Sequence, residues 1–239
     1  MLYKYETHLH TTEASACATS PAKDYIQTYI NIGYSGIIVT DHFWGGNTCV
    51  SRELPWKDWV NNFCLGYDHA LEEAELINKK TGRDFKVFFG FEQTFDGDDY
   101  LIYGLGKDWL LENPEVVSMN HSQLFENVNN NGGLMIQAHP FRFRGYQRAI
   151  HVHPREVHGV EIYNAGNTPE ENELAELYAK QYGFRVTSGS DIHHTTFITE
   201  RTENSMPVGG VAFEHKINTI QDYIDGIKDG KGQFLREKV

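Results

Sequence analysis

The sequence Gly36-Ile37-Ile38-Val39-Thr40-Asp41-His42 decides how the fold of this chain is interpreted. Its first five residues are mostly aliphatic and β-branched, which is typical of a strand buried on both faces. An aspartate and a histidine follow at once, where the strand ends. The stretch therefore predicts a buried strand that delivers polar side chains to the rim of a sheet.

Further short runs share this strand character, and helical patterns separate many of them. The other predicted strands cover residues 3–7, 85–89, 100–103, 134–137, 160–163, 185–187 and 210–213. The predicted helices cover residues 20–33, 56–80, 122–130, 169–182 and 218–228. Alternation of strands and helices predicts a largely parallel α/β sheet with helices outside, in one domain over residues 1–239. The pattern alone does not separate a barrel from an open sheet.

Composition excludes several classes of function. The chain has 239 residues and a net charge of −12, which disfavours bulk binding of nucleic acid because phosphate backbones are held by clustered Lys and Arg. No apolar run approaches 18 residues, so no membrane association is expected. The N-terminus lacks the apolar core of a signal peptide, and three cysteines without motif spacing argue against a disulfide framework. A cytoplasmic protein is expected.

Histidines and carboxylates follow five of the predicted strands, and one aspartate precedes a sixth. These residues are His8, His10, Asp41, His42, Glu92, Asp99, His139, Asp191 and His193. In a parallel sheet such positions gather at one rim, where so many imidazoles and carboxylates would need cations between them. Mixed nitrogen and oxygen ligands suit zinc, manganese or iron. The ligands outnumber the needs of one ion, which predicts two or three divalent ions sharing a bridging carboxylate.

The ordered motifs resemble those of the PHP (polymerase and histidinol phosphatase) family. They are His-Leu-His-Thr at 8–11, Thr-Asp-His at 40–42, Glu92, Ala-His-Pro at 138–140 and Gly-Ser-Asp-Ile-His at 189–193. Each motif is weak alone, but their order and spacing are specific. The resemblance implies a distorted, seven-stranded, TIM-like (β/α)7 barrel with three metal ions and phosphoesterase activity.

The resemblance also implies a role for each ligand. In the family pattern, His8, His10 and Asp191 bind the first ion, Glu92 bridges the first and third, His42 and His193 bind the second, and His139 binds the third. Two positions depart from the common pattern. Glu13 stands in the loop where the family often has His or Asp, and Asp99 stands where it often has His. Both are kept as candidate ligands, and the oxygen of Asp99 would favour manganese or iron.

Four residues near the rim are candidates for direct catalytic roles. Arg142 and Arg144 follow Ala-His-Pro and can clamp a phosphate, while Asp41 and His194 can assist the leaving oxygen. Asp41 alternatively orients a neighbour. Cys17 is either a soft ligand or a small filler. A second group of histidines, at 151, 153 and 158, is predicted to be a solvated loop, and the histidine at 121 is expected at the surface.

The expected activity is hydrolysis of a small phosphorylated substrate, such as histidinol phosphate, a nucleotide phosphate or phosphotyrosine. Two alternatives stay open. Metal-dependent amidohydrolases also carry His-x-His and a late Asp, but typically use a strand-end lysine, and none falls at a predicted strand end here. A metal-loaded, non-catalytic scaffold would fit a chain that has lost ligands.

Overall fold

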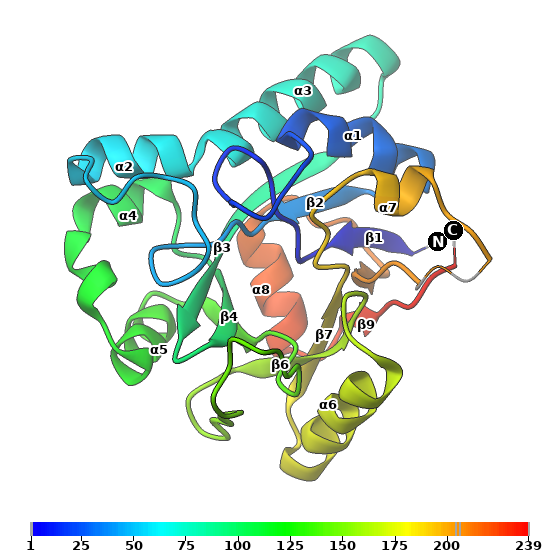
Figure 1. Ribbon diagram of the computed structural model, residues 1–239. Coiled ribbons are helices and arrows are strands. Elements are labelled where there is room, and N and C mark those ends of the chain that lie inside the picture. Colours follow the sequence, from blue (N-terminus) through cyan, green and yellow to red (C-terminus); the bar gives the residue numbers. More distant parts are fainter. Residues whose placement is uncertain (1, 204, 206, 239) are drawn as a thin grey trace.

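One strongly curved sheet forms the centre of the computed structural model, which describes residues 2–203, 205 and 207–238 (Figure 1). In this part of the chain the sheet has nine strands in the order β7-β6-β5-β4-β3-β2-β1-β8-β9. They are β1 (Tyr3–Glu6), β2 (Gly36–Val39), β3 (Lys86–Phe95), β4 (Asp98–Tyr103), β5 (Leu134–Gln137), β6 (Gly159–Asn164), β7 (Arg185–Gly189), β8 (Val211–Phe213) and β9 (Gln233–Phe234).

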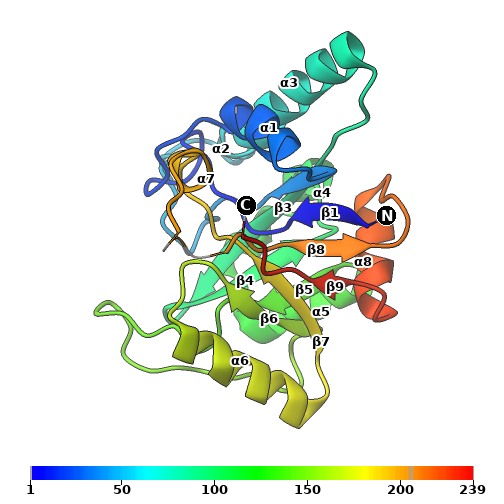
Figure 2. The same cartoon turned by 90° about the vertical axis from the view of Figure 1, so that its right-hand side faces the viewer.

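The helices surround this sheet. They are α1 (Ala22–Asn31), α2 (Trp56–Phe63), α3 (Leu65–Thr81), α4 (Lys107–Glu112), the 3-10 turn η1 (Pro114–Ser118), α5 (His121–Asn130), α6 (Pro169–Tyr182), α7 (Thr196–Thr199) and α8 (Ile220–Lys228). The predicted helix 56–80 is divided into α2 and α3 at Cys64. Figure 2 shows α1 and α3 on one side of the sheet and α6 on the opposite side.

The expectation of seven strands is wrong, since the described residues form nine, and the pairing is mixed rather than wholly parallel. β1 with β2, β2 with β3, β5 with β6, and β6 with β7 are parallel. β4 is antiparallel to both β3 and β5 because the short Asp96-Gly97 turn joins β3 to β4. Asp96 and Gly97 have φ of 53° and 93°, the positive values that a tight hairpin needs. β8 and β9 add two more antiparallel strands beyond β1.

The first and last parts of the sheet approach each other and nearly close it into a barrel. Thr7 Oγ1 donates to Ser188 O at 2.7 Å, linking the end of β1 to β7. Ser188 Oγ accepts from Gly210 N at 3.0 Å and donates to Leu235 O at 2.9 Å. The α/β, barrel-like class predicted from the sequence is therefore confirmed, with a different strand count.

Helix α8 closes the end of the barrel where β1 begins (Figure 2). Its buried residues Tyr223, Ile224 and Ile227 belong to one apolar cluster with Leu101 and Tyr103 of β4. Burial of these side chains shields the bottom of the barrel from water. The opposite rim, where β1 and β2 end, is left for polar groups. Within the described residues, no helix combines the length and apolar character needed to cross a membrane.

Candidate metal centre

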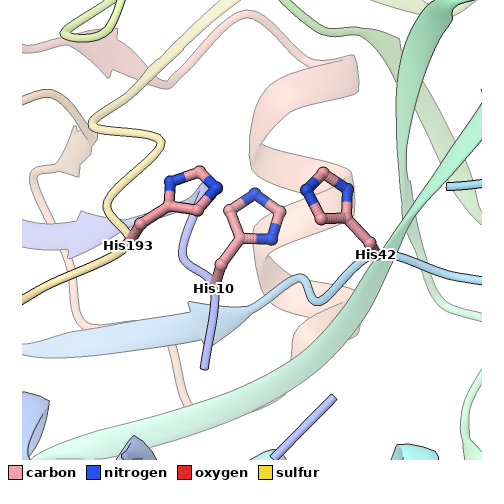
Figure 3. A group of neighbouring side chains, drawn as sticks. All are labelled: His10, His42 and His193. Carbon is pink, nitrogen blue, oxygen red and sulfur yellow. The ribbon is translucent and has the colours of Figure 1, made fainter. Parts of the chain in front are cut away.

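The strand-end residues converge at the open rim of the barrel. Eight of the nine predicted ligands fall into four overlapping groups. In each group, the potential ligand atoms are no more than 4.8 Å from one another. The groups are His10, His42, His193; His8, His10, Glu92; His8, His139, Asp191; and Glu92, Asp99, His139. Figure 3 shows the first group, in which residues from three different strand ends place their rings side by side.

His8 and His10 form the innermost part of this cluster. Both are fully buried, and their Nε2 atoms lie 3.1 Å apart. Asp191 Oδ1 lies 3.4 Å from His8 Nε2 and 3.2 Å from His10 Nε2. The alternation of side chains along the extended segment after β1 puts both imidazoles on one face. Two imidazole nitrogens and one carboxylate oxygen facing a common point is an arrangement that fits a transition-metal ion.

Glu92 provides the test of whether these residues fit a metal. Its carboxylate is 1% exposed and lies among four imidazoles, 2.7 Å from His42 Nδ1, 3.0 Å from His8 Nε2, and 3.5 Å from both His10 Nε2 and His139 Nε2. None of these pairs has hydrogen-bond geometry, so both carboxylate oxygens are buried without a hydrogen bond. A buried carboxylate in that state is costly unless a cation satisfies it. The donor set therefore fits divalent metal ions, with Glu92 shared between groups.

Two of the clustered residues sit on unusual backbone. His139 has φ of 30° and Asp191 has φ of 52°, values that side-chain-bearing residues adopt at a cost. Such strain concentrates at functional sites, where the surrounding structure holds it in place. Here it turns the His139 and Asp191 side chains into the cluster at the ends of β5 and β7.

The electrostatics of the cluster are strongly coupled. Burial alone would lower the pKa of His8, but the carboxylates of Asp191, Glu161 and Glu92 raise it well above its usual value. Burial and repulsion from His42 and His193 lower the pKa of His10. Burial and repulsion from Glu92 raise the pKa of Asp99 to about 6. Opposite shifts in adjoining groups are expected where many ionisable side chains share one buried space.

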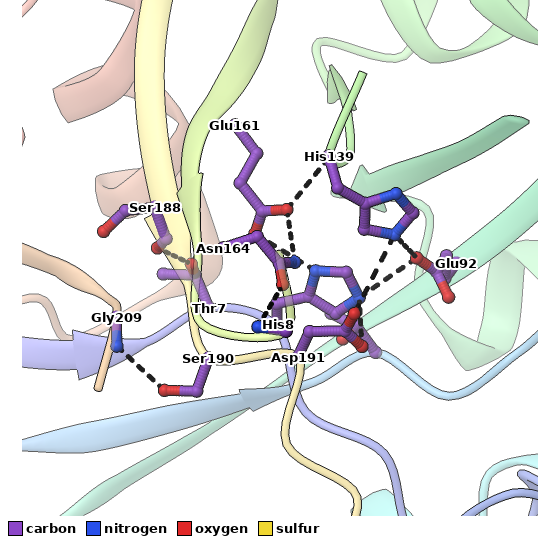
Figure 4. Close-up of polar contacts among 12 residues, drawn as sticks. Thr7, His8, Glu92, His139, Glu161, Asn164, Ser188, Ser190, Asp191 and Gly209 are labelled. Carbon is purple, nitrogen blue, oxygen red and sulfur yellow. Dashed lines mark hydrogen bonds and ion pairs between the residues drawn. The ribbon is translucent and has the colours of Figure 1, made fainter. Parts of the chain in front are cut away.

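Glu161 of β6 holds two cluster residues in place and was missed by the sequence reasoning. Its Oε1 lies 3.1 Å from His8 Nδ1, and its Oε2 accepts from His139 N at 3.1 Å and Asn164 Nδ2 at 2.8 Å (Figure 4). A carboxylate bonded to the outer nitrogen of a histidine fixes the tautomer whose other nitrogen can bind a metal. The available signal was a charged residue inside the apolar strand Val160–Tyr163.

Asp41 acts through its neighbours rather than at the centre of the cluster. It is 2% exposed and accepts hydrogen bonds from Thr11 N, Thr11 Oγ1 and Ser15 Oγ at 2.6–2.7 Å. Ser15 Oγ in turn lies 3.2 Å from His10 Nδ1 and accepts from His42 N. Asp41 therefore positions two histidines, and its carboxylate does not face the cleft as a proton donor would.

Three other predicted site residues lie outside the cluster. Glu13 accepts from the Ala22 amide at the start of α1 and lies 3.1 Å from His69 Nδ1. Arg144 forms an ion pair with Glu171 of α6. His194 is exposed, and its ring bonds to Thr196 Oγ1. The structure thus does not bring Glu13 to the metal ligands, nor Arg144 and His194 to the cleft, because each is engaged locally by a neighbouring element.

The cluster opens into a cleft of about 530 Å³. Its walls combine the cluster residues with Cys17, Asn47, Thr94, Arg142 and Tyr146. Arg142 is held firmly there, since its guanidinium donates to Asp191 Oδ2 at 2.6 Å, Asn164 Oδ1 at 2.7 Å and Asn167 Oδ1 at 2.8 Å. Burial alone would raise the pKa of the Cys17 thiol, but contacts with His193 and His42 lower it to about 6.

Solved structures share this architecture. A crystal structure of a two-domain protein from Bacteroides vulgatus, containing a predicted PHP-like metal-dependent phosphoesterase, superposes with a TM-score of 0.69 and 15% identity. The alignment covers 99% of this chain and 65% of that one, so the chain spans just under two thirds of its length. The chain has the PHP-like fold.

Other solved structures align with this chain to different degrees. PsfC from Pseudomonas syringae aligns with a TM-score of 0.63 and 14% identity, over 99% of this chain and 92% of that one. An amidohydrolase from Chromobacterium violaceum, with bound sulfate and no metal, aligns with a TM-score of 0.50 and 13% identity, over 97% of both chains. No protein-family model and no curated protein sequence matches the chain. The resemblance predicted from the motifs is confirmed at the level of the fold.

Proposed function

We propose that this chain is a PHP-type, divalent-metal-dependent phosphoesterase that hydrolyses small phosphomonoesters. One observation carries the proposal: Glu92 is a buried carboxylate in contact with four imidazoles and without a hydrogen bond. Such a group is stable where cations lie beside it. The cleft beside it is open to a small substrate, and the fold is that of PHP-like proteins.

Two or three ions of zinc, manganese or iron suit the ligand set. The four groups of ligands share His8, His10, Glu92 and His139, so neighbouring ions would be linked through common side chains. When bound, such ions lower the pKa of a coordinated water and offset the charge of a phosphoryl group. Eight ligands are too many for one tetrahedral ion, which favours a multinuclear centre.

The protein's own residues orient the reacting groups. Glu161 holds His8 and the backbone of His139, while Asp41 holds His10 and His42 through Ser15. Arg142 presents a fixed guanidinium at the wall of the cleft, where its charge can offset that of phosphoryl oxygens. Fixed orientation matters because misplacement of ligands or donors raises the barrier sharply.

The size of the cleft supports a small substrate rather than a polymer. About 530 Å³ accommodates a small organic phosphate, such as histidinol phosphate, a nucleotide monophosphate or phosphotyrosine. The net charge of −12 disfavours bulk nucleic acid as a substrate.

The proposal is tested with a panel of phosphomonoesters, phosphodiesters, amides and lactones, each assayed with zinc, manganese and iron. We expect turnover of a phosphomonoester that falls more than about 100-fold in His8→Ala and Asp191→Ala, since several kcal/mol of metal assistance is lost. His215→Ala removes an exposed histidine that belongs to none of the four ligand groups, so this control should retain wild-type activity and metal content.

Other outcomes point to the rival functions. Hydrolysis of amides or lactones in preference to phosphoesters would identify an amidohydrolase. Bound metal without turnover of any phosphoester would identify a non-catalytic scaffold. A His8→Ala protein with wild-type rate and metal content would exclude the cluster as the active site.

A further inference from the structure

A second group of metal-ligating side chains lies away from the rim cluster. His121 begins α5, and His153 and Glu156 lie in the segment between β5 and β6. Their potential ligand atoms all lie within 4.8 Å of one another. None of the three lines the cleft. The sequence predicted a surface position for His121, but the side chain is buried.

The two imidazoles face one carboxylate. His121 Nδ1 lies 3.3 Å and His153 Nδ1 lies 3.9 Å from Glu156 Oε2. The rings are stacked with centroids 3.9 Å apart and an interplanar angle of 22°. The separation at His153 is too long for a hydrogen bond, so the carboxylate does not explain its placement. Ser122 Oγ contacts both Glu156 oxygens at 3.0 Å and holds the carboxylate in this orientation.

The protein satisfies the hydrogen-bonding groups of His121 only in part. The His121 Nε2 atom is buried without a hydrogen-bond partner. Two imidazoles brought together beside one carboxylate are thus poorly satisfied by the protein alone.

Strand β4 separates this group from the rim cluster. Asp99 belongs to the rim cluster, and the next residue, Tyr100, packs on His121 and His153 with ring centroids 4.5 and 5.9 Å away. Because successive side chains of a strand point to opposite faces, the two groups lie on opposite faces of β4. Side-chain exposures of 29% for His153 and 41% for Glu156 leave a route for an ion to enter.

His153 and Glu156 also belong to the segment 141–158, the earlier part of which lines one wall of the cleft. Arg142 and Tyr146 line the cleft, and the same segment continues to His153 and Glu156 before β6. Between them, His151 Nδ1 lies 2.5 Å from Asp98 Oδ2, and Gln147 Nε2 donates to Gly97 O. A link between this segment and α5 would complete its attachment to the barrel.

We infer that His121, His153 and Glu156 bind one divalent transition-metal ion, with zinc the best fit, and that this ion fastens the segment 141–158 to α5. Two nitrogen ligands and one oxygen ligand match zinc, with a fourth position left to water. The ion holds the segment that carries Arg142 and Tyr146 against the rim.

The first test counts zinc bound by the full-length protein. Metal-free protein is incubated with zinc and desalted, and bound zinc is measured by mass spectrometry. We expect His153→Ala and Glu156→Gln each to hold one ion fewer than the wild type and the His215→Ala control. Glu156→Gln preserves the shape of the side chain and an oxygen for Ser122, so it remains informative if His153→Ala folds poorly. Equal zinc content in all four folded proteins would refute the second site.

The second test uses tryptic cleavage at the exposed Arg148, within the fastened segment. We expect zinc to slow this cleavage in the wild type and in His215→Ala more than in His153→Ala or Glu156→Gln. Equal protection of all four would mean that the group only caps the start of α5. Neither readout requires phosphoesterase activity, so these results are independent of the proposed reaction.

Discussion

Replacing Glu161 by glutamine tests how the protein keeps His8 in the tautomer that can bind a metal. Glu161 is 1% exposed, and each of its oxygens is used as an acceptor. One faces His8 Nδ1 at 3.1 Å, and the other faces the amides of His139 and Asn164 at 3.1 and 2.8 Å. Glutamine has the same shape but only one acceptor oxygen.

The new amide has two orientations with different consequences. If its oxygen faces His8, its NH₂ group opposes two N–H donors, and each unsatisfied buried donor costs about 1–3 kcal/mol. If its NH₂ group faces His8, the two donors keep their acceptor, and the His8 proton moves from Nδ1 to Nε2. The second orientation is favoured, and it places a proton on the nitrogen that lies 3.1 Å from His10 Nε2.

We therefore expect metal affinity to fall about 10- to 100-fold, or about 1.4–2.8 kcal/mol, with less than about 1 kcal/mol lost from the metal-free protein. Affinity is measured by competition with a chromophoric chelator, and stability by urea unfolding of the metal-free form. Nitrogen NMR of the metal-free protein, at a pH above the pKa of His8, reports which of its ring nitrogens carries the proton. Glu173→Gln, on the exposed face of α6, is the matched control. A folded Glu161→Gln protein that binds metal within about twofold of the wild type would contradict this role of Glu161.

Three further changes test the electrostatics of the rim cluster. In metal-free protein the pKa of Asp99 is raised to about 6 from 3.8, so as the pH rises from about 3 to about 7 the wild type should lose about 3 kcal/mol of unfolding free energy that Asp99→Asn keeps. Urea titrations across this range that show the same slope for both proteins would contradict the assignment. Arg142→Ala removes the partner of Asp191 and should destabilise metal-free protein by about 3–5 kcal/mol, but metal-loaded protein by less, because cations replace the lost charge. Arg142→Lys is its control, and an equal loss in both forms would count against a metal beside Asp191. Chelation of the wild type should lower the melting temperature measured by calorimetry, since ions at about 100 times their dissociation constant contribute about 2.7 kcal/mol. An unchanged melting temperature would mean that the ions are not bound to the folded state.

Much of the rim cluster could be predicted from local sequence. A polar residue that directly follows a buried strand necessarily lies at the end of that strand. His8, His10, His42, His139 and Asp191 are of this kind, and the structure brings all five together. Their chemistry as metal ligands follows from residue type alone.

Other features needed the tertiary structure. Glu13 and Arg144 are near the motifs in sequence, but each contacts a distant partner instead of the cluster. Glu13 contacts His69, 56 residues away, and Arg144 contacts Glu171, 27 residues away. Glu161 looked like an ordinary strand residue, yet closure of the barrel brings it to His8, 153 residues distant. His121 and His153 meet because both pack on Tyr100 of β4.

The sequence by itself determined the alternation of strands and helices and the residues placed at strand ends, because hydrophobic periodicity and turn chemistry act over a few residues. Only the tertiary structure decided the nine-stranded order, the antiparallel β4 and the partners of each ionisable side chain. These features depend on how segments distant in sequence pack when the sheet curves and closes. The energy of such long-range contacts is not encoded in any local sequence pattern.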